Sequence, residues 1–146
     1  MDPLNRLLLQ DLVSATKSGS EEQLVKLLSM GVQPNVVDSS SGWSALHAAV
    51  LFNLGSLPML LRHCTEPDVP TVGGGTPLAY VVHELGENPA PGRSQELVAA
   101  IEMLLSAGAR PGAGVGDQTP LELARLYRLS DVQVLLERRG SNESGA

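Results

Sequence analysis

The three histidines and the single cysteine are the side chains of this sequence best suited to chemistry. His63 and Cys64 are neighbours, as a base and a thiol nucleophile would have to be in space. Adjacent residues on a helix point in different directions, however, and a catalytic pair requires side chains that converge. Neither His63 nor His83 has a cysteine or carboxylate partner at the spacing of a zinc site. The pattern therefore predicts neither a nucleophile–base pair nor a metal site.

A run of glycines at 73–75 followed by Thr76 is the next candidate, because glycine-rich loops bind phosphate. The phosphate-binding loop also requires a lysine before its serine or threonine, and this run has none. We interpret it as a flexible turn tip. The pairs Glu21–Glu22 and Arg138–Arg139 lie in the first and last turns of expected helices, where they complement the helix dipoles. We therefore expect no catalytic residue, no cofactor and no metal, and a protein that is not an enzyme.

The charge balance excludes further classes of function. The chain has 146 residues, of which 16 are acidic and 10 basic, giving a net charge of −6. An acidic surface repels the phosphate backbone, so we expect no nucleic-acid partner. No apolar run approaches the roughly 20 residues that span a membrane, and the first residues do not resemble a signal peptide. We expect no membrane insertion and a cytoplasmic or nuclear location.

The apolar residues point to a thin core. They make up 42% of the sequence and are mostly leucine, valine and alanine. The aromatic residues are only four: Trp43, Phe52, Tyr80 and Tyr127. A thick globular core normally depends on large rings for its buried area. A repetitive core of stacked helices suits this composition better.

A short motif recurs along the chain and marks the helices. It reads Ser-Ala-Leu-His at 44–47, Thr-Pro-Leu at 76–78 and Thr-Pro-Leu again at 119–121. Its leucines are about 32 and then about 43 residues apart, so the second interval contains an insertion of about ten. Each copy is followed by a second apolar helix that ends in a pair of leucines, and an upstream copy at 21–28 keeps that second helix. Internal repetition of this kind indicates a solenoid.

The residues at the ends of these helices support the same interpretation. Thr76 and Thr119 are suited to cap a helix start, and a proline follows each of them at the first helical position, where a missing N–H is harmless. We expect the second helices to stop at left-handed glycines, namely Gly31, Gly108 and Gly140.

On these residues the chain resembles the ankyrin-repeat family, whose unit of about 33 residues is a turn followed by two antiparallel helices with a Thr-Pro-Leu-His-x-Ala signature. The resemblance implies an all-α fold, an ankyrin-repeat solenoid of about four helix-turn-helix units with short hairpin turns. The expected organisation is one domain over 1–140 and a flexible tail over 141–146. Its repeats span approximately 10–38, 39–70, 71–113 with an inserted loop at 86–94, and 114–140.

The resemblance also implies where a partner binds. In this family the ligand surface is the concave face, built from the turn tips and the exposed side of each first helix, and the motif histidine, here His47, braces the turn of its own repeat. By register the expected partner-binding residues are Ser40, Ser41, Trp43, Leu51, Phe52, Val72, Gly73, His83, Glu84, Gln118, Leu126 and Tyr127, with Gly75, Val115 and Gly116 at the same turn tips.

Three of the four aromatic residues fall in this set, and aromatic side chains are common in binding hot spots. The alternative is that Phe52 and Tyr127 pack between repeats. The expected function is that of an adaptor or regulator, alone or in a larger complex, which binds a segment of another protein. The second hypothesis is a stoichiometric inhibitor of a kinase or other enzyme, similar to the four-repeat ankyrin inhibitors of cyclin-dependent kinases.

Overall fold

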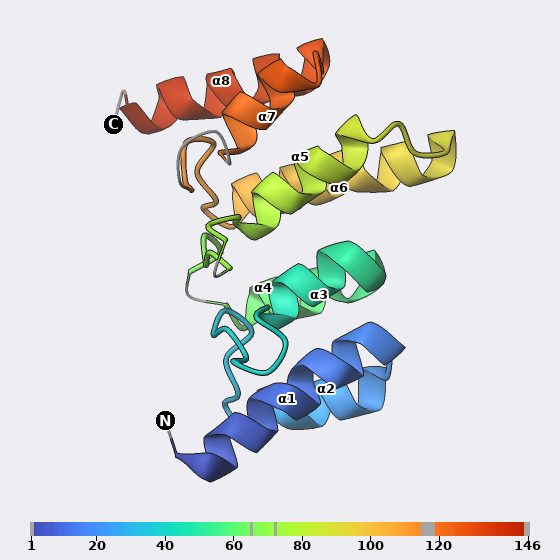
Figure 1. The fold of residues 1–146 in the computed structure, drawn as a ribbon, viewed down its shortest axis with the longest axis vertical. Coiled ribbons are helices and arrows are strands. Elements are labelled where there is room, and N and C mark those ends of the chain that lie inside the picture. The colour runs from blue at the N-terminus through green and yellow to red at the C-terminus, as the bar shows by residue number, and fades with distance from the viewer. Residues whose placement is uncertain (1, 65, 72, 115–118, 145–146) are drawn as a thin grey trace.

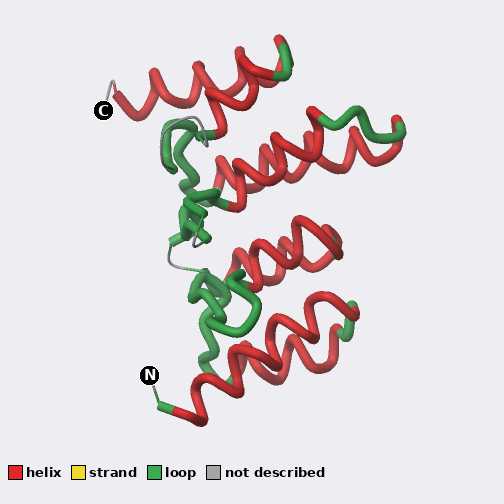
Figure 2. The backbone as a smooth tube through the Cα atoms, in the orientation of Figure 1, coloured by secondary structure: helices red, strands yellow, loops and turns green. Residues whose placement is uncertain are grey.

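The computed structural model of the chain (Figure 1) describes residues 2–64, 66–71, 73–114 and 119–144. Within these ranges the backbone forms helices and turns and no strand (Figure 2). The helices follow one another as antiparallel pairs, which confirms the all-helical repeat fold. They are α1 (Pro3–Ser18) with α2 (Glu21–Ser29), α3 (Ala45–Phe52) with α4 (Leu57–Arg62) after the short 3-10 helix η1 (Leu54–Ser56), α5 (Pro77–Gly86) with α6 (Pro91–Ser106), and α7 (Pro120–Leu126) with α8 (Ser130–Ser144).

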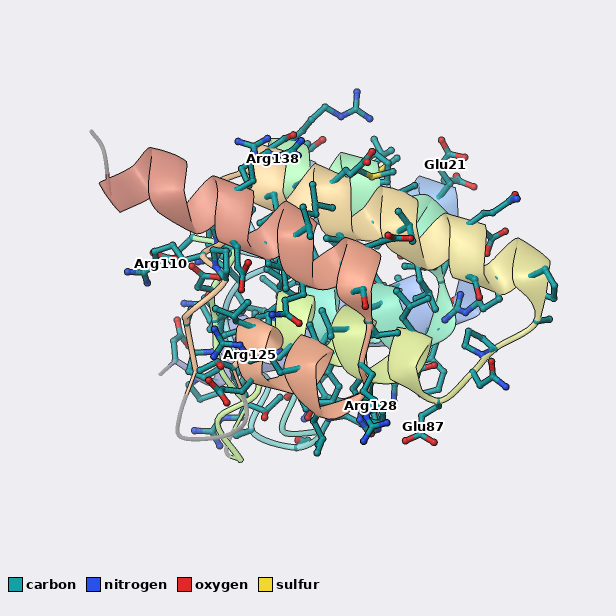
Figure 3. All side chains as sticks on the ribbon, turned by 90° about the horizontal axis from the view of Figure 1, so that it is seen from above. Glu21, Glu87, Arg110, Arg125, Arg128 and Arg138 are labelled. Carbon is teal, nitrogen blue, oxygen red and sulfur yellow. The ribbon has the colours of Figure 1, made fainter. Side chains whose placement is uncertain are left out.

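The pairs stack in two layers. The first helices α1, α3, α5 and α7 pack on one another in sequence, and each second helix lies behind its first helix (Figure 1). The turns between pairs gather at one end of the helices (Figure 2). In the view along the stack, Glu87 and Arg128 lie on the side of the first helices, whereas Arg138 and Glu21 lie on the side of the second helices (Figure 3). The exposed side of α1, α3, α5 and α7, with the turns that precede α3 and α5, is called the first-helix face below.

The helix ends follow the local chemistry of the sequence. The Thr76 hydroxyl accepts a hydrogen bond from the backbone N–H of Ala79 at 3.3 Å, and the Thr119 hydroxyl accepts one from Glu122 at 3.2 Å. These bonds satisfy donors that the first turn of a helix leaves free. Gly31 and Gly108 follow α2 and α6 in the left-handed conformation, with φ of +88° and +104°, as the sequence predicts.

The core is a continuous band of aliphatic side chains from Leu9 in α1 to Leu136 in α8. The buried side chains of this band are leucine, isoleucine, valine and alanine. Leu46 and Leu78 of the repeated motif are fully buried, as are Leu60 and Leu104 of the second helices. Each helix pair therefore buries its apolar surface against its neighbours, as expected for a solenoid.

The prediction of a loop over 86–94 is wrong at both ends, because the structure forms a loop only over 87–90. Helix α5 ends at Gly86 and α6 begins at Pro91, so only 87–90 connect them. Pro91 stands in the first turn of α6, where proline is compatible with a helix. The inserted residues thus lengthen α6, and Arg93 fixes the extension by donating from Nη2 to the carbonyl oxygen of Val50 in α3 at 3.2 Å.

The expected helix stop at Gly140 is also wrong. Helix α8 continues through Gly140 to Ser144, so Gly140 does not stop the helix and 141–144 are not a frayed tail. A glycine inside a helix costs only about 1 kcal/mol relative to alanine. The earlier turns of α8 are anchored in the core by Val132 and Leu136, which allows the helix to pass this residue. Residues 145–146 lie outside the described residues.

The irregular turn after α4 is tied to the turn after α6. The buried carboxylate of Asp68 accepts hydrogen bonds from the backbone N–H of Arg110 at 3.0 Å and from its Nε at 3.0 Å. Burial raises the pKa of Asp68, while the hydrogen bonds from Arg110 oppose that rise. Because these turns belong to successive repeats, the pair holds their spacing at the end of the stack where the turns gather.

Candidate functional site

The first-helix face carries the residues that the sequence assigned to partner binding. Val72 and Gln118, with Val115 and Gly116, lie outside the described residues. All of the others but Glu84 lie in or beside two groups of contacting side chains and a hollow between them; Glu84 is half-buried in α5. The first group lies over α1 and α3, and the second lies over α5 and α7.

The first group is an aromatic cluster formed by Trp43, Phe52 and Lys17. The rings of Trp43 and Phe52 lie 5.6 Å apart between centroids and are tilted by 43°. The Nζ of Lys17 lies 4.9 Å from the centroid of the Trp43 ring and 5.3 Å from that of Phe52. Phe52 is 54% exposed, and Leu51 beside it is half-buried. The sequence placed the two rings on one face; their mutual contact and the contribution of Lys17 were not predicted.

Trp43 is held in place by the turn that precedes α3. The backbone N–H of Asp38 donates to the carbonyl oxygen of Trp43 at 2.8 Å, and Gly42 closes the turn at φ +81°. The Ser41 hydroxyl accepts from the backbone N–H of Trp43 at 3.3 Å. The Ser40 hydroxyl accepts from Nε2 of Gln10 in α1 at 2.6 Å. Ser40 and Ser41 therefore help to fix the turn, whatever contacts they make with a partner.

Phe52 and Lys17 are positioned through their neighbours in the sequence. Asn53 ends α3, and its Nδ2 donates to the carbonyl oxygen of Thr16 near the end of α1 at 3.2 Å. Because Phe52 precedes Asn53 and Lys17 follows Thr16, this bond links the two backbones beside the aromatic cluster. The geometry of the aromatic cluster thus has support outside the cluster itself.

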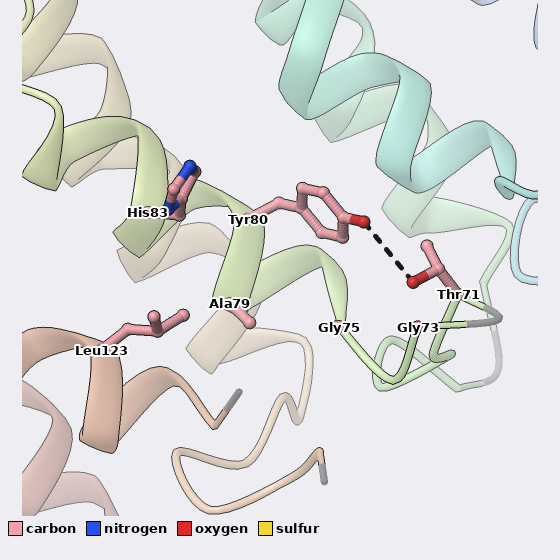
Figure 4. A pocket seen from close by; sticks show the side chains of 7 residues that line it. All are labelled: Thr71, Gly73, Gly75, Ala79, Tyr80, His83 and Leu123. Atoms are coloured by element: carbon pink, nitrogen blue, oxygen red, sulfur yellow. Dashed lines mark hydrogen bonds between the residues drawn. The ribbon is translucent and has the colours of Figure 1, made fainter. Parts of the chain in front are cut away.

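A hollow of about 210 Å³ opens beside the turn before α5 (Figure 4). It is mainly apolar, with Ala79 and Leu123 buried and Tyr80 half-buried. The Tyr80 hydroxyl lies 3.4 Å from that of Thr71 at its edge (Figure 4). Its lining residues are Thr71, Gly73, Gly75, Ala79, Tyr80, His83 and Leu123.

The sequence pattern predicted Gly73, Gly75 and His83 on the binding face but not the other residues of this hollow. A signal for it was present. Gly75 precedes the capping Thr76, as Trp43 precedes the capping Ser44. Where the second repeat presents a large ring, the third therefore has no side chain. A Cβ on Gly75 would stand only 2.9 Å from the Tyr80 ring, so this ring occupies the space next to the glycine.

His47 connects the two parts of the face from within the core. The backbone N–H of Ser44 can only donate, so Nδ1 of His47 accepts it, at 3.2 Å. Nε2 then carries the hydrogen and donates to the carbonyl oxygen of Gly75 at 3.0 Å. The imidazole meets the Tyr80 ring edge-on at 5.3 Å. His47 therefore braces its own turn, as the family resemblance implied, and also the turn of the next repeat.

Burial determines the protonation state of His47. The side chain is fully buried, and the loss of hydration lowers its pKa from 6.5 to about 4, although the hydrogen bond to Gly75 opposes the shift. The ring is neutral at physiological pH, which agrees with an Nδ1 that accepts a hydrogen bond.

The second group joins Tyr127 to the end of α5. The Tyr127 hydroxyl donates to Oε1 of Glu87 at 2.9 Å and lies 2.9 Å from Nδ1 of His83. The hydrogen bond to Glu87 raises the pKa of Tyr127. The ring of Tyr127 packs between repeats, which is the alternative considered above, whereas Phe52 is exposed. Next to it, Leu126 is 71% exposed.

Gly86 is the point where this second group is tightest, because a Cβ there would overlap the Tyr127 ring. We expect Gly86→Ala to lower the free energy of unfolding by about 1–3 kcal/mol, as overpacking does. In a Tyr127→Ala background the same change should be neutral or stabilising, since alanine is the better helix former. Urea unfolding of the two single variants and the double variant measures this coupling. Equal destabilisation in both backgrounds would show that the ring does not restrict Gly86.

The contacts of His63 and Cys64 do not support a nucleophile–base pair. Nδ1 of His63 donates to the carbonyl oxygen of Met59 at 3.1 Å. Burial is the main cause that raises the pKa of the Cys64 thiol, which disfavours the reactive thiolate. Among the described residues no group of three or more histidine, cysteine, aspartate or glutamate side chains could hold a metal ion. None of the helices in the described ranges has the length and apolarity needed to cross a membrane.

Comparison with known families agrees with the geometry. Residues 12–61, which cover most of the first two helix pairs, match the family model of ankyrin repeats in many copies. No curated protein matches the chain significantly. The match is consistent with the ankyrin-repeat resemblance that the stacked helix pairs, the capping motifs and the bridging histidine also support.

Proposed function

We propose that this protein is an interaction module that acts as an adaptor or regulator by binding a segment of a partner protein on its first-helix face. Ankyrin repeats generally mediate protein–protein interaction. The observation that carries the proposal is a hollow on this face with an exposed apolar side chain in the repeat on either side of it. Phe52 and Leu126 are more than half exposed there, and the hollow beside Tyr80 lies between the repeats that carry them. Exposed apolar side chains around a hollow are typical of binding surfaces.

The arrangement along the stack favours an extended segment as the ligand. The aromatic cluster lies over α1 and α3, the hollow over α5, and Leu126 at the end of α7. A partner segment that runs along the stack would contact these features in succession, first the aromatic cluster and then the hollow, which can accept a side chain. Most of its binding energy should come from the few large side chains, as in other interfaces.

The test compares matched variants in affinity capture followed by a binding titration with the captured protein. Trp43→Ala and Phe52→Ala should each weaken binding by about 2 kcal/mol, or roughly 30-fold. Trp43 is half-buried, so Trp43→Ala should also lower fold stability, and by more than the replacement of the exposed Phe52; melting curves of both variants measure this cost. The control is Val134→Ala, because Val134 is 51% exposed but lies on α8 in the second-helix layer.

The identity of the captured protein separates the two regulatory hypotheses. A kinase or other enzyme inhibited at equal stoichiometry would support the inhibitor. A scaffold or an unstructured peptide segment would support the adaptor. If Val134→Ala abolishes binding while Trp43→Ala and Phe52→Ala do not, the partner binds the second-helix layer and the proposed face is wrong.

A further inference from the structure

The Lys17 ammonium lies over two aromatic rings at once. Its Nζ is 4.9 Å from the Trp43 centroid and 5.3 Å from the Phe52 centroid, both within the range of a cation–π interaction. In the described part of the chain, these rings are the partners of this ammonium, and no carboxylate lies within ion-pair distance of it. The two rings therefore form a surface that accepts a cation, and the chain's own lysine occupies it.

We propose that the aromatic cluster is a binding site for the ammonium group of a partner's lysine, in particular a methylated lysine, and that Lys17 is an internal occupant which the partner displaces. The proposal rests on the proposed function, because it names the chemistry that the partner segment brings to the same face. The site is the surface formed by Trp43 and Phe52 after the Lys17 ammonium has moved away.

Displacement is favourable because Lys17 is a weak occupant. Its side chain is exposed, and a cation–π interaction at an exposed site is much weaker than one from which water is excluded. A partner segment that lies on the first-helix face would exclude water from the rings. A trimethylated ammonium has no N–H to hydrate, so it loses less on leaving water than the primary ammonium of Lys17. Methylation of the partner should therefore strengthen binding.

The backbone supports of both rings do not depend on the Lys17 side chain. Trp43 is fixed by the hydrogen bonds of its turn, including the one from the backbone N–H of Asp38 at 2.8 Å. The backbone next to Phe52 is anchored by the bond between Asn53 and Thr16 at 3.2 Å. Neither contact involves the Lys17 side chain. Replacing Lys17 should therefore leave the backbone at both rings in place.

The charge of the protein favours the same ligand. The net charge of −6 attracts a cationic segment and repels an acidic one over the distances at which proteins meet. A neutral aliphatic side chain could also pack on two rings, but it would gain nothing from the ring quadrupoles. The difference between a cation and a neutral group of the same shape is therefore the decisive measurement.

Trp43 is the only tryptophan, so its fluorescence reports directly on the site. The probes are N-acetyl-trimethyllysine amide and an analogue in which a neutral tert-butyl group replaces the trimethylammonium. We expect saturable binding of the first probe at least fivefold tighter than of the second. Lys17→Met should tighten binding of the cationic probe by about two- to fivefold, and Phe52→Ala should weaken it by at least fivefold. Phe52→Tyr, which keeps a ring face, should preserve it.

Three results would overturn the proposal. They are equal affinity for the charged and neutral probes, unchanged affinity in Lys17→Met, and binding that survives Phe52→Ala. Phosphatidylcholine vesicles present the same quaternary ammonium on a lipid; tighter binding to them than to the lysine probe would overturn the assignment to a partner's side chain. Lys17 is exposed, so its replacement should leave the melting curve unchanged. A failed titration combined with partner capture that depends on Phe52 would reject this site and leave the proposed function intact.

Discussion

Replacing Leu104 by alanine is expected to lower the free energy of unfolding by about 2–5 kcal/mol. Leu104 is fully buried in α6, in the middle of the aliphatic band. The change removes apolar surface from the core and leaves a cavity, and both effects destabilise the folded state. The core is only one layer of side chains between the helices of neighbouring pairs, so few residues can shift to fill the space. Urea denaturation followed by circular dichroism measures the loss.

The matched control is Leu126→Ala, which makes the same chemical change at a side chain that is 71% exposed. Its effect on stability should stay within about 0.5 kcal/mol. Under the proposed function it should instead weaken partner binding, so the two leucines have opposite roles. A loss of stability for Leu126→Ala as large as that for Leu104→Ala would show that Leu126 packs in the core.

The sequence predicted the regular parts of the fold because their determinants are local. A threonine cap, a proline at the first helical position and a left-handed glycine each act within one turn of a helix. These signals marked the starts of α5 and α7 and the ends of α2 and α6. These local signals gave the wrong prediction where another contact outweighed them. Pro91 and Gly92 resemble a loop, yet they begin α6, because proline suits a first turn and Arg93 ties the new turn to Val50.

The candidate site was less predictable because it depends on contacts between repeats. Register alone placed Trp43 and Phe52 on one face, since both positions recur in the three repeats that carry the turn motif. It could not show that Lys17 covers both rings, because that contact depends on the angle between α1 and α3. Tyr127 occupies the same register position as Phe52, but it bonds to Glu87, a residue of the inserted connection, which the regular repeat lacks. The insertion thus changed the role of an otherwise equivalent aromatic residue.

Stability is expected to fall by roughly 3 kcal/mol through His47 alone as the pH drops from 6.5 to about 4. In the unfolded chain the imidazole takes up a proton near its ordinary pKa of 6.5, whereas in the folded protein burial keeps it neutral down to about 4. Between these values the unfolded state binds more protons, so lowering the pH favours unfolding by about 1.4 kcal/mol per pH unit. Below about pH 4 both states are protonated, and this contribution to the pH dependence ends.

The comparison with His47→Gln isolates this effect, because glutamine is neutral at every pH and keeps a donor and an acceptor. The variant should be less stable than the wild type near neutral pH, since its shorter reach weakens the bridge from Ser44 to Gly75. The difference in unfolding free energy between the two proteins should shrink as the pH falls.

Asp68 acts in the opposite direction, because its raised pKa lets the folded state take up a proton before the unfolded state does. Its contribution is common to both proteins and cancels. Unfolding free energies measured at several pH values test the argument. A difference that is constant from neutral pH to about pH 4 would mean that His47 is not held neutral by burial, and the bridge between the two turns would then have to accommodate an imidazolium.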